Sequence, residues 1–294
     1  MITRSTLLHC RFGFSLYLLP VFLLALASLP HFDNAGALLS FLVLHAFLYP
    51  ASNGFNSYYD RDTESIGALR NPPPVTPDLL RFSLALDAAA IALSLLVSPL
   101  FAAAALVYGL VSKAYSWNRI RLKKYGVAGL LLVAAGHGPV MFLLVAAVAG
   151  AVSPHELFTF RYLFPALMTG CYLLGFYPLT QIYQHAEDAR RNDRTLSRMA
   201  GVSGTFIIAA SGIGLAVGGY GWYFYRYCGS RTALFFLLCI LPAAVHFGRW
   251  LFGWFRHGTG VEYGNMARMH LFAASGLNLF AGCILLHDCL HRMG

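Results

Sequence analysis

Long apolar runs dominate the sequence and limit what the chain can fold into. A helix needs about 20 mainly apolar residues to cross a bilayer. Nine runs approach or exceed that length: 13–30, 35–55, 79–98, 100–117, 126–149, 162–183, 202–224, 232–252 and 268–287. Only 11% of the 294 residues are charged, against about 25% in an average soluble domain. The outside of the folded chain must therefore be largely apolar and face lipid.

These runs predict an all-α fold: a polytopic membrane protein of nine transmembrane helices around a central cavity, with residues 1–294 forming a single domain. The Ser98-Pro99 break predicts a tight hairpin between the third and fourth helices. Gly214 and Gly218 form a GxxxG step, which permits close helix packing.

Basic residues are distributed unevenly between the two ends of these helices. With nine spans, one side of the membrane holds 17 of the 21 Lys and Arg residues. The opposite side holds the other four, which are Arg161, Arg226, Arg231 and Arg292. Because cytosolic loops carry an excess of Lys and Arg, we expect the first side to face the cytosol, across the inner membrane of a bacterium.

The net charge of +9 indicates an anionic partner. A nucleic-acid-binding domain would spread its basic residues over a polar face, whereas this chain concentrates them in short segments between apolar runs. We therefore expect membrane lipids and an anionic small molecule as partners, and no nucleic acid.

An acidic cluster follows the second apolar run. Asn56, Asp60 and Glu64 stand at positions i, i+4 and i+8, so a continuous helix would place them on one face. Ionisable groups near the bilayer cost about 2–3 kcal/mol each and are rarely incidental. Carboxylate and amide oxygens suit Mg²⁺, which often binds one or two carboxylates together with substrate phosphate oxygens. The alternative is a solvated helix end, covered by Arg61 and Asp62.

A second cluster follows the sixth run, on the same side of the membrane. Gln184 and Asp188 are again four residues apart, and Asn192 lies one turn further on. Two such clusters that face each other across a cavity could hold two Mg²⁺ ions around one diphosphate.

Basic residues between the fourth and fifth runs suit the same ligand. The segment 113–124 contains five cations, among them Arg121 and Lys123, which can clamp phosphate oxygens. Alternatively, these cations set the topology and attract anionic lipids.

In these features the chain resembles the UbiA-type superfamily of intramembrane prenyltransferases. That family has nine transmembrane helices and two Asp-rich motifs, on the cytosolic loops 2–3 and 6–7. The first motif, N-x-x-x-D-x-x-x-D, matches Asn56, Asp60 and Glu64. The second, D-x-x-x-D followed by a basic stretch that ends in Arg-Thr or Lys-Thr, matches Gln184, Asp188 and Arg194-Thr195.

Three further stretches match the family pattern: Tyr115-Ser116 with Arg121 and Lys123, Arg11 with Pro20, and Arg70 with Pro72. The resemblance implies Mg²⁺ ligands, which are Asn56, Asp60, Glu64, Gln184 and Asp188. It implies residues that bind the diphosphate, which are Arg11, Arg70, Arg121, Lys123 and Arg194. It also implies catalytic roles for Tyr115, Asp60 and Asp188.

The chain departs from the family pattern at two positions. Glu64 replaces an Asp by a longer carboxylate. Gln184 replaces the first Asp of the second motif and brings no charge, so the second metal site should be weaker unless Glu187 or Asp193 contributes.

The resemblance implies ionisation of a prenyl diphosphate. Mg²⁺ and basic residues would stabilise the departing diphosphate, and aromatic rings would stabilise the allylic cation. By position, the aromatic residues for this role are Tyr58, Tyr59, Tyr115 and Tyr183.

The cation then has two fates. Our leading hypothesis is transfer to an aromatic or other lipophilic acceptor, and the alternative is a membrane terpene cyclase that needs no second substrate. A third hypothesis is that the chain is a transporter or a lipid-binding membrane protein. Transporters place charged groups near the bilayer midplane, whereas these acids lie at helix ends.

Overall fold

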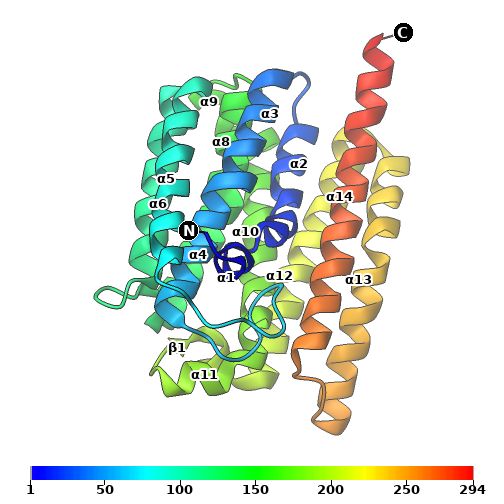
Figure 1. The fold of residues 1–294 in the computed structure, drawn as a ribbon. Helices are drawn as coiled ribbons and strands as arrows, with labels where there is room; N and C mark the ends of the chain where they lie inside the picture. Colours follow the sequence, from blue (N-terminus) through cyan, green and yellow to red (C-terminus); the bar gives the residue numbers. More distant parts are fainter. Residues whose placement is uncertain (1, 294) are drawn as a thin grey trace.

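The computed structural model describes the backbone of residues 2–293 and the side chains of residues 2–287, and it is a bundle of helices that share one main direction (Figure 1). In this part of the chain, eight helical segments are long and apolar enough to cross a membrane. They are Arg4–Ala27, Asn34–Asp60, Asp78–Val97, Gly126–Ala149, Phe160–Arg190, Leu196–Cys228, Ser230–His257 and Tyr263–His287. The predicted all-α membrane fold is therefore confirmed.

The count of nine spans is not confirmed. The fourth expected span is helix α6 (Pro99–Ser116), which forms the predicted hairpin with α5 (Asp78–Val97). Its last turn is polar and contains Lys113, which pairs with Asp87 of α5. This polar turn shortens the apolar part of α6 relative to the other eight segments.

Three of the spans are interrupted near their middle. The first consists of α1 (Arg4–Cys10), a 3₁₀-helix (Phe12–Tyr17) and α2 (Leu19–Ala27). The second consists of α3 (Asn34–Leu42), a π-helical segment (Val43–Leu48) and α4 (Tyr49–Asp60). The third consists of α7 (Gly126–Ala135), a π-helical segment (Gly136–Val140) and α8 (Met141–Ala149). Pro50 and Pro139 lie at the two π-helical segments, where their missing N–H groups disfavour regular α-helix.

The second half of the chain contains the longest helices. Between α6 and α7 lies a 3₁₀-helix (Leu122–Lys124), and beyond α8 follow α9 (Pro154–Leu157), α10 (Phe160–Gln181), a 3₁₀-helix (Ile182–Gln184), α11 (His185–Arg190), β1 (Arg194–Thr195), α12 (Leu196–Cys228), α13 (Ser230–His257) and α14 (Tyr263–Met293). Strand β1 bridges in parallel to Tyr125 and Gly126, which ties the segment after α11 to the start of α7.

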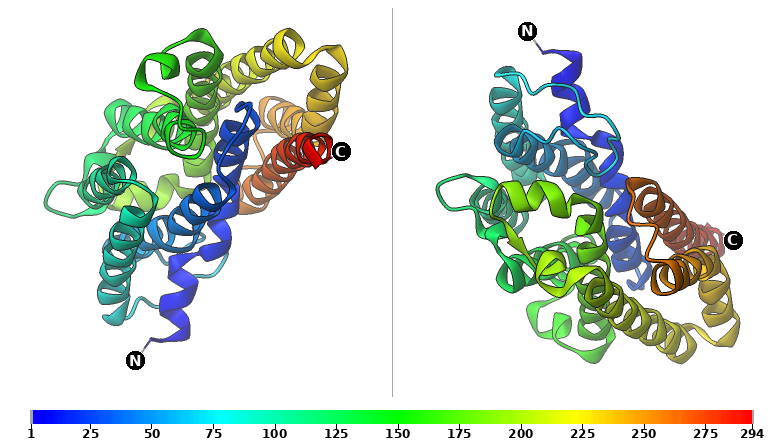
Figure 2. Two further views of the ribbon diagram at one scale, coloured as in Figure 1. Left: turned by 90° about the horizontal axis from the view of Figure 1, so that it is seen from above. Right: turned by 90° about the horizontal axis from the view of Figure 1, so that it is seen from below.

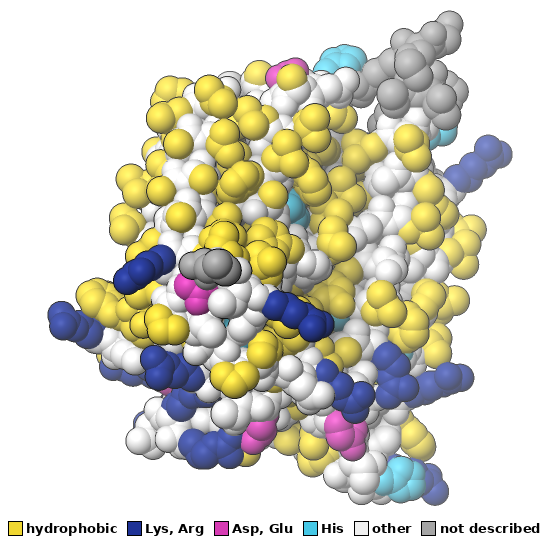
Figure 3. Space-filling model, viewed as in Figure 1, with side chains coloured by type: hydrophobic (Ala, Val, Ile, Leu, Met, Phe, Trp, Pro, Cys, Tyr) yellow, Lys and Arg dark blue, Asp and Glu magenta, His cyan; other side chains and the backbone are white. Residues whose placement is uncertain are grey.

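The helices place the polar segments together at one end of the bundle. Viewed along the bundle, the N-terminal helices lie between α5 and α14 (Figure 2). On the face shown in Figure 3, most of the Lys and Arg side chains lie on the lower part, near the end where Figure 1 shows α11 and β1, and apolar side chains cover the upper part. This polar end is where both acidic clusters are found.

Helices α10 and α12 approach each other closely through two glycines. A Cβ added at Gly212 would lie 2.7 Å from the carbonyl oxygen of Cys171, and one added at Gly175 would lie 2.8 Å from the nitrogen of Ile213. A Cβ added at Gly214 or Gly218 would have no atom within 4 Å, so no helix among the described residues uses that step for close packing. The close contact lies at Gly212 instead, because the face of α12 that carries Gly212 packs against α10.

Candidate functional site

The first acidic cluster lies where α4 ends. Asn56 Nδ2 donates hydrogen bonds to Asp60 Oδ2 at 2.9 Å and to Ser116 Oγ at 3.0 Å, so the predicted i, i+4 pair forms. Arg61 then adopts a left-handed conformation with φ of 49°, and its N–H caps the helix on the carbonyl of Ser57. The helix therefore stops one turn before Glu64, and the predicted single face of three residues is wrong for that residue.

Asp62, rather than Glu64, lies on the wall of the adjacent cavity. Asp62 pairs with Arg191 at 2.6 Å, and both side chains line the cavity. Glu64 pairs with Arg190 at 2.8 Å, with the two side chains 48% and 58% exposed. Burial raises the pKa of the Asp62 carboxyl to about 7, and the neighbouring Asp60 adds to the shift. A cation bound beside Asp62 would favour its charged form.

The second cluster lies on the 3₁₀-helix and on α11. Gln184 and Asp188 both line the same cavity as Asn56 and Asp60. Asp188 accepts a hydrogen bond from Thr195 Oγ1 at 3.1 Å, so β1 orients its carboxylate. The two predicted clusters therefore meet across one cavity.

The two other acids of this region have partners elsewhere. Glu187 Oε1 accepts from the backbone N–H groups of Thr63 at 3.0 Å and Glu64 at 3.2 Å. Asp193 accepts two hydrogen bonds from Arg121, both of 2.7 Å. Glu187 thus fixes the loop after α4, and Asp193 fixes Arg121, instead of replacing the charge that Gln184 lacks.

Three cations line the cavity near the clusters. They are Arg11, Lys123 and Arg191. Lys123 pairs with Asp60, and Arg121 also approaches Asp60 at 3.2 Å. Sequence reasoning missed Arg191 as a site residue, although it stands three residues after Asp188, where one helical turn would bring the two side chains together.

Arg70 and Arg194 lie away from the cavity wall. Both side chains are exposed. Arg70 belongs to the loop between α4 and α5, and Arg194 belongs to β1, where alternation sends its side chain away from that of Thr195. Their roles in binding diphosphate stay predictions, as does the role of Glu64 in binding metal.

Aromatic side chains form part of the same wall. The hydroxyl groups of Tyr115 and Tyr177 lie 2.9 Å apart, and both rings line the cavity together with Tyr183. Tyr58 and Tyr59 are not among the residues that line it. No sequence pattern indicates Tyr177, since it lies inside an apolar span and before the second motif.

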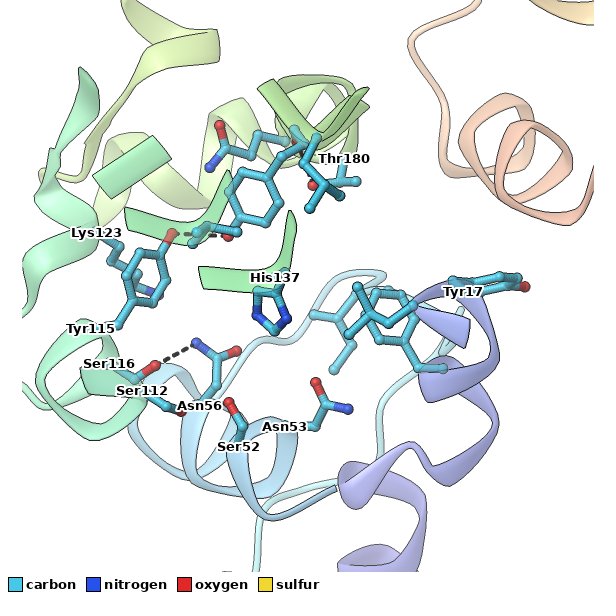
Figure 4. A pocket seen from close by; sticks show the side chains of 18 of the residues that line it. Tyr17, Ser52, Asn53, Asn56, Ser112, Tyr115, Ser116, Lys123, His137 and Thr180 are labelled. Atoms are coloured by element: carbon cyan, nitrogen blue, oxygen red, sulfur yellow. Dashed lines mark hydrogen bonds between the residues drawn. The ribbon is translucent and has the colours of Figure 1, made fainter. Parts of the chain in front are cut away.

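The cavity has a volume of about 270 Å³ and adjoins a second, more apolar cavity of about 280 Å³. The side chains shared by both walls are Tyr17, Leu18, Tyr172 and Leu173. Figure 4 shows the first cavity with Asn56, Ser116, Tyr115 and Lys123 on one side and Tyr17 on the other. A charged group and a long apolar chain of one molecule could therefore occupy adjacent spaces.

The donor atoms fit a hard cation that brings further ligands of its own. Among the described residues, no group of three or more His, Cys, Asp or Glu side chains is arranged to hold a metal ion. However, Asp60 Oδ1 is buried and accepts no hydrogen bond, although Arg121 forms an ion pair with it at 3.2 Å, and the amide of Asn56 and the carboxylate of Asp188 line the same cavity. Such an oxygen set suits Mg²⁺ when phosphate oxygens complete the coordination.

The chain matches known proteins in sequence and in fold. The UbiA prenyltransferase family matches over residues 17–262. A structure of a UbiA homolog from Archaeoglobus fulgidus bound to DMAPP and Mg²⁺ has 15% sequence identity and a TM-score of 0.69, over 96% of this chain and 99% of that chain. A structure of digeranylgeranylglyceryl phosphate synthase has 17% identity and a TM-score of 0.56, over 97% and 98% of the two chains. No curated protein sequence matches this chain.

Proposed function

Starting from the fact that this chain belongs to the UbiA prenyltransferase family, we propose that it is a Mg²⁺-dependent enzyme that ionises a prenyl diphosphate inside the membrane. In this proposal the prenyl group passes to an aromatic or other lipophilic acceptor. The active site faces the cytosol, in a bacterium across the inner membrane. One observation supports this proposal most strongly. Both polar clusters and three cations line the same cavity, and an apolar cavity adjoins it.

Two groups of residues have different roles in ionisation: the cations stabilise the diphosphate, and the acids and amides would hold Mg²⁺. Arg11, Lys123 and Arg191 stabilise the negative charge that grows on the departing diphosphate. Asn56, Asp60 and Asp188 would hold Mg²⁺, with the carbonyl oxygen of Gln184 as a neutral ligand. When bound there, Mg²⁺ supplies further charge neutralisation of the leaving diphosphate. The Archaeoglobus fulgidus homolog bound to DMAPP and Mg²⁺ supports both ligands.

The cavity walls suit the carbon part of the substrate. The faces of Tyr115, Tyr177 and Tyr183 stabilise the allylic cation by cation–π attraction, worth about 0.5–2 kcal/mol for each ring. The apolar cavity beside them receives the isoprenoid chain and keeps water away from the cation.

Replacement of single acids tests this proposal. We expect Asp60→Ala and Asp188→Ala each to lower Mg²⁺-dependent release of pyrophosphate by about 100-fold or more, since each removes a carboxylate that would hold the Mg²⁺ ion that neutralises the leaving diphosphate. Purified protein in lipid nanodiscs, given prenyl diphosphates of several lengths, provides the measurement. Release that persists in both variants would rule out this site assignment.

The same assay separates the transferase from the cyclase. Gln184, which lowers the charge of the second cluster, is compatible with either enzyme. A prenylated acceptor, identified by mass spectrometry, supports the transferase. A cyclic hydrocarbon formed from the diphosphate alone would establish the cyclase instead.

A further inference from the structure

The second acidic cluster offers few carboxylates to the cavity. Gln184 is neutral, and its Nε2 donates a hydrogen bond to the carbonyl of Ser65 at 3.3 Å. Glu187 and Asp193 accept their hydrogen bonds elsewhere, so neither supplies the charge that Gln184 lacks. Among the described residues of this cluster, Asp188 is therefore the one acid that lines the cavity.

Two of the three carboxylates that line the cavity are already paired with cations. Asp60 pairs with Lys123, and Asp62 pairs with Arg191 at 2.6 Å. Asp188 forms no ion pair with a described residue and accepts a hydrogen bond from a hydroxyl group. Mg²⁺ usually binds one or two carboxylates together with phosphate oxygens. The carboxylate charge left unpaired on this wall therefore suits one Mg²⁺ ion rather than two.

Arg191 supplies a positive charge next to the second cluster. It follows Asp188 by three residues, directly after α11, and lines the cavity with a side chain that is 23% exposed. Its neighbour Arg190 differs, because its side chain is 58% exposed, pairs with Glu64 and is not among those that line the cavity. Of these two adjacent arginines, only Arg191 lies where the second cluster lacks an acid.

The two other cations of the wall are associated with the first cluster. Lys123 lies on the same side of the cavity as Asn56 (Figure 4). Arg11 donates to the carbonyl of Asn53, on α4, at 3.3 Å. Arg191 is thus the cation that the second cluster itself contributes to the cavity. A guanidinium group is planar, has five N–H donors and binds phosphate oxygens in pairs, so it can bind a diphosphate while it stays near a carboxylate.

We propose that a prenyl diphosphate binds here with a single Mg²⁺ ion, and that the guanidinium group of Arg191 takes the place of a second ion. This inference rests on the proposed function and deepens it. Asn56, Asp60 and Asp188 hold the one ion, and Arg191 binds phosphate oxygens from the side of the second cluster. Because Arg stays charged at every physiological pH, this part of the charge compensation does not depend on the Mg²⁺ concentration.

A count of bound metal ions tests this inference without any turnover. Purified protein in nanodiscs receives dimethylallyl S-thiolodiphosphate, which ionises slowly, and Mn²⁺, a paramagnetic ion that prefers the same oxygen ligands as Mg²⁺. We expect electron paramagnetic resonance to find one Mn²⁺ per chain, without coupling between ions. Two coupled ions per chain would overturn the inference and leave the proposed function intact. If no Mn²⁺ binds, the proposed function fails, and the inference fails with it.

The two adjacent arginines provide a matched pair of variants. We expect Arg191→Gln to lower pyrophosphate release about 100-fold at every Mg²⁺ concentration, as loss of one donor to a developing negative charge does. Arg191→Lys should lower it only about tenfold, because Lys keeps the charge but not the paired N–H donors. Arg190→Gln is the control and should change the rate less than about twofold, because it breaks an exposed ion pair. Equal rates of Arg191→Gln and Arg190→Gln would overturn the inference.

A double variant tests whether a metal ion can replace the arginine. Gln184→Asp adds a carboxylate to the second cluster, so in the Arg191→Gln background it should allow a second ion to bind. We expect two bound Mn²⁺ per chain and a rate about tenfold above that of Arg191→Gln alone. One bound ion together with no gain in rate would overturn the inference. If the Arg191→Gln variants fail to fold, the metal count of the wild-type protein and the rate of Arg191→Lys decide the question.

Discussion

At the scale of single residues, Asp62 and Glu64 are the most informative pair. Both are acids of the same loop, but only Asp62 lines the cavity. We expect Asp62→Asn to lower the rate of pyrophosphate release by about 10–100-fold, in the range measured for loss of residues that support a metal site. Glu64→Gln should change it less than about twofold, because it breaks an exposed ion pair. Mg²⁺ titrations of both variants provide the measurement, and a larger effect of Glu64→Gln would restore Glu64 as the ligand.

One backbone conformation explains why Glu64 does not share the helical face that its spacing from Asn56 and Asp60 predicted. The spacing of Asn56 and Asp60 correctly predicted a shared helical face, because their hydrogen bond lies within α4. The helix ends because Arg61 adopts a positive φ. Rules for helix ends look for Gly or Asn at such a position, so an Arg gives no signal.

At the scale of helices, hydropathy predicted the apolar spans but not their irregular parts. Apolar composition is enough to identify a membrane helix, and it identified all eight spanning segments. The π-helical segments depend on how Pro50 and Pro139 are accommodated by neighbouring helices, which composition does not encode. The same limit applies to the glycines of α12. Composition does not show that Gly212, rather than Gly214 or Gly218, contacts α10, since the contact depends on how α12 is rotated against α10.

The close contact between α10 and α12 makes a prediction about stability. A methyl group at Gly212 would lie 2.7 Å from backbone atoms of α10, so the helices must move apart. We expect Gly212→Ala to lower the free energy of unfolding by about 1–3 kcal/mol, as overpacking does. Thermal unfolding in detergent provides the measurement, with Gly218→Ala as the control because its methyl group would meet no atom within 4 Å. Equal stability of the two variants would contradict the packing described.

At the scale of the whole molecule, charge sets the direction of the bundle in the membrane. Arg256 and His257 end α13 near the polar end that carries the proposed site, whereas Arg226 and Arg231 flank the opposite turn between α12 and α13. Because basic loops stay in the cytosol, the excess of Lys and Arg at the polar end predicts that this end is cytosolic.

Reporter fusions test that orientation directly. We expect a fluorescent protein fused after Gly260 to fluoresce in bacterial cells, because the chain would end in the cytosol at that point. Alkaline phosphatase fused after Gly229 should be active, because the turn between α12 and α13 would lie outside the cytosol. A fusion after Asn192, between α11 and β1, serves as the control and should behave like the fusion after Gly260. The opposite pattern at all three points would place the diphosphate cavity on the outer side, where cytosolic prenyl diphosphates could not reach it.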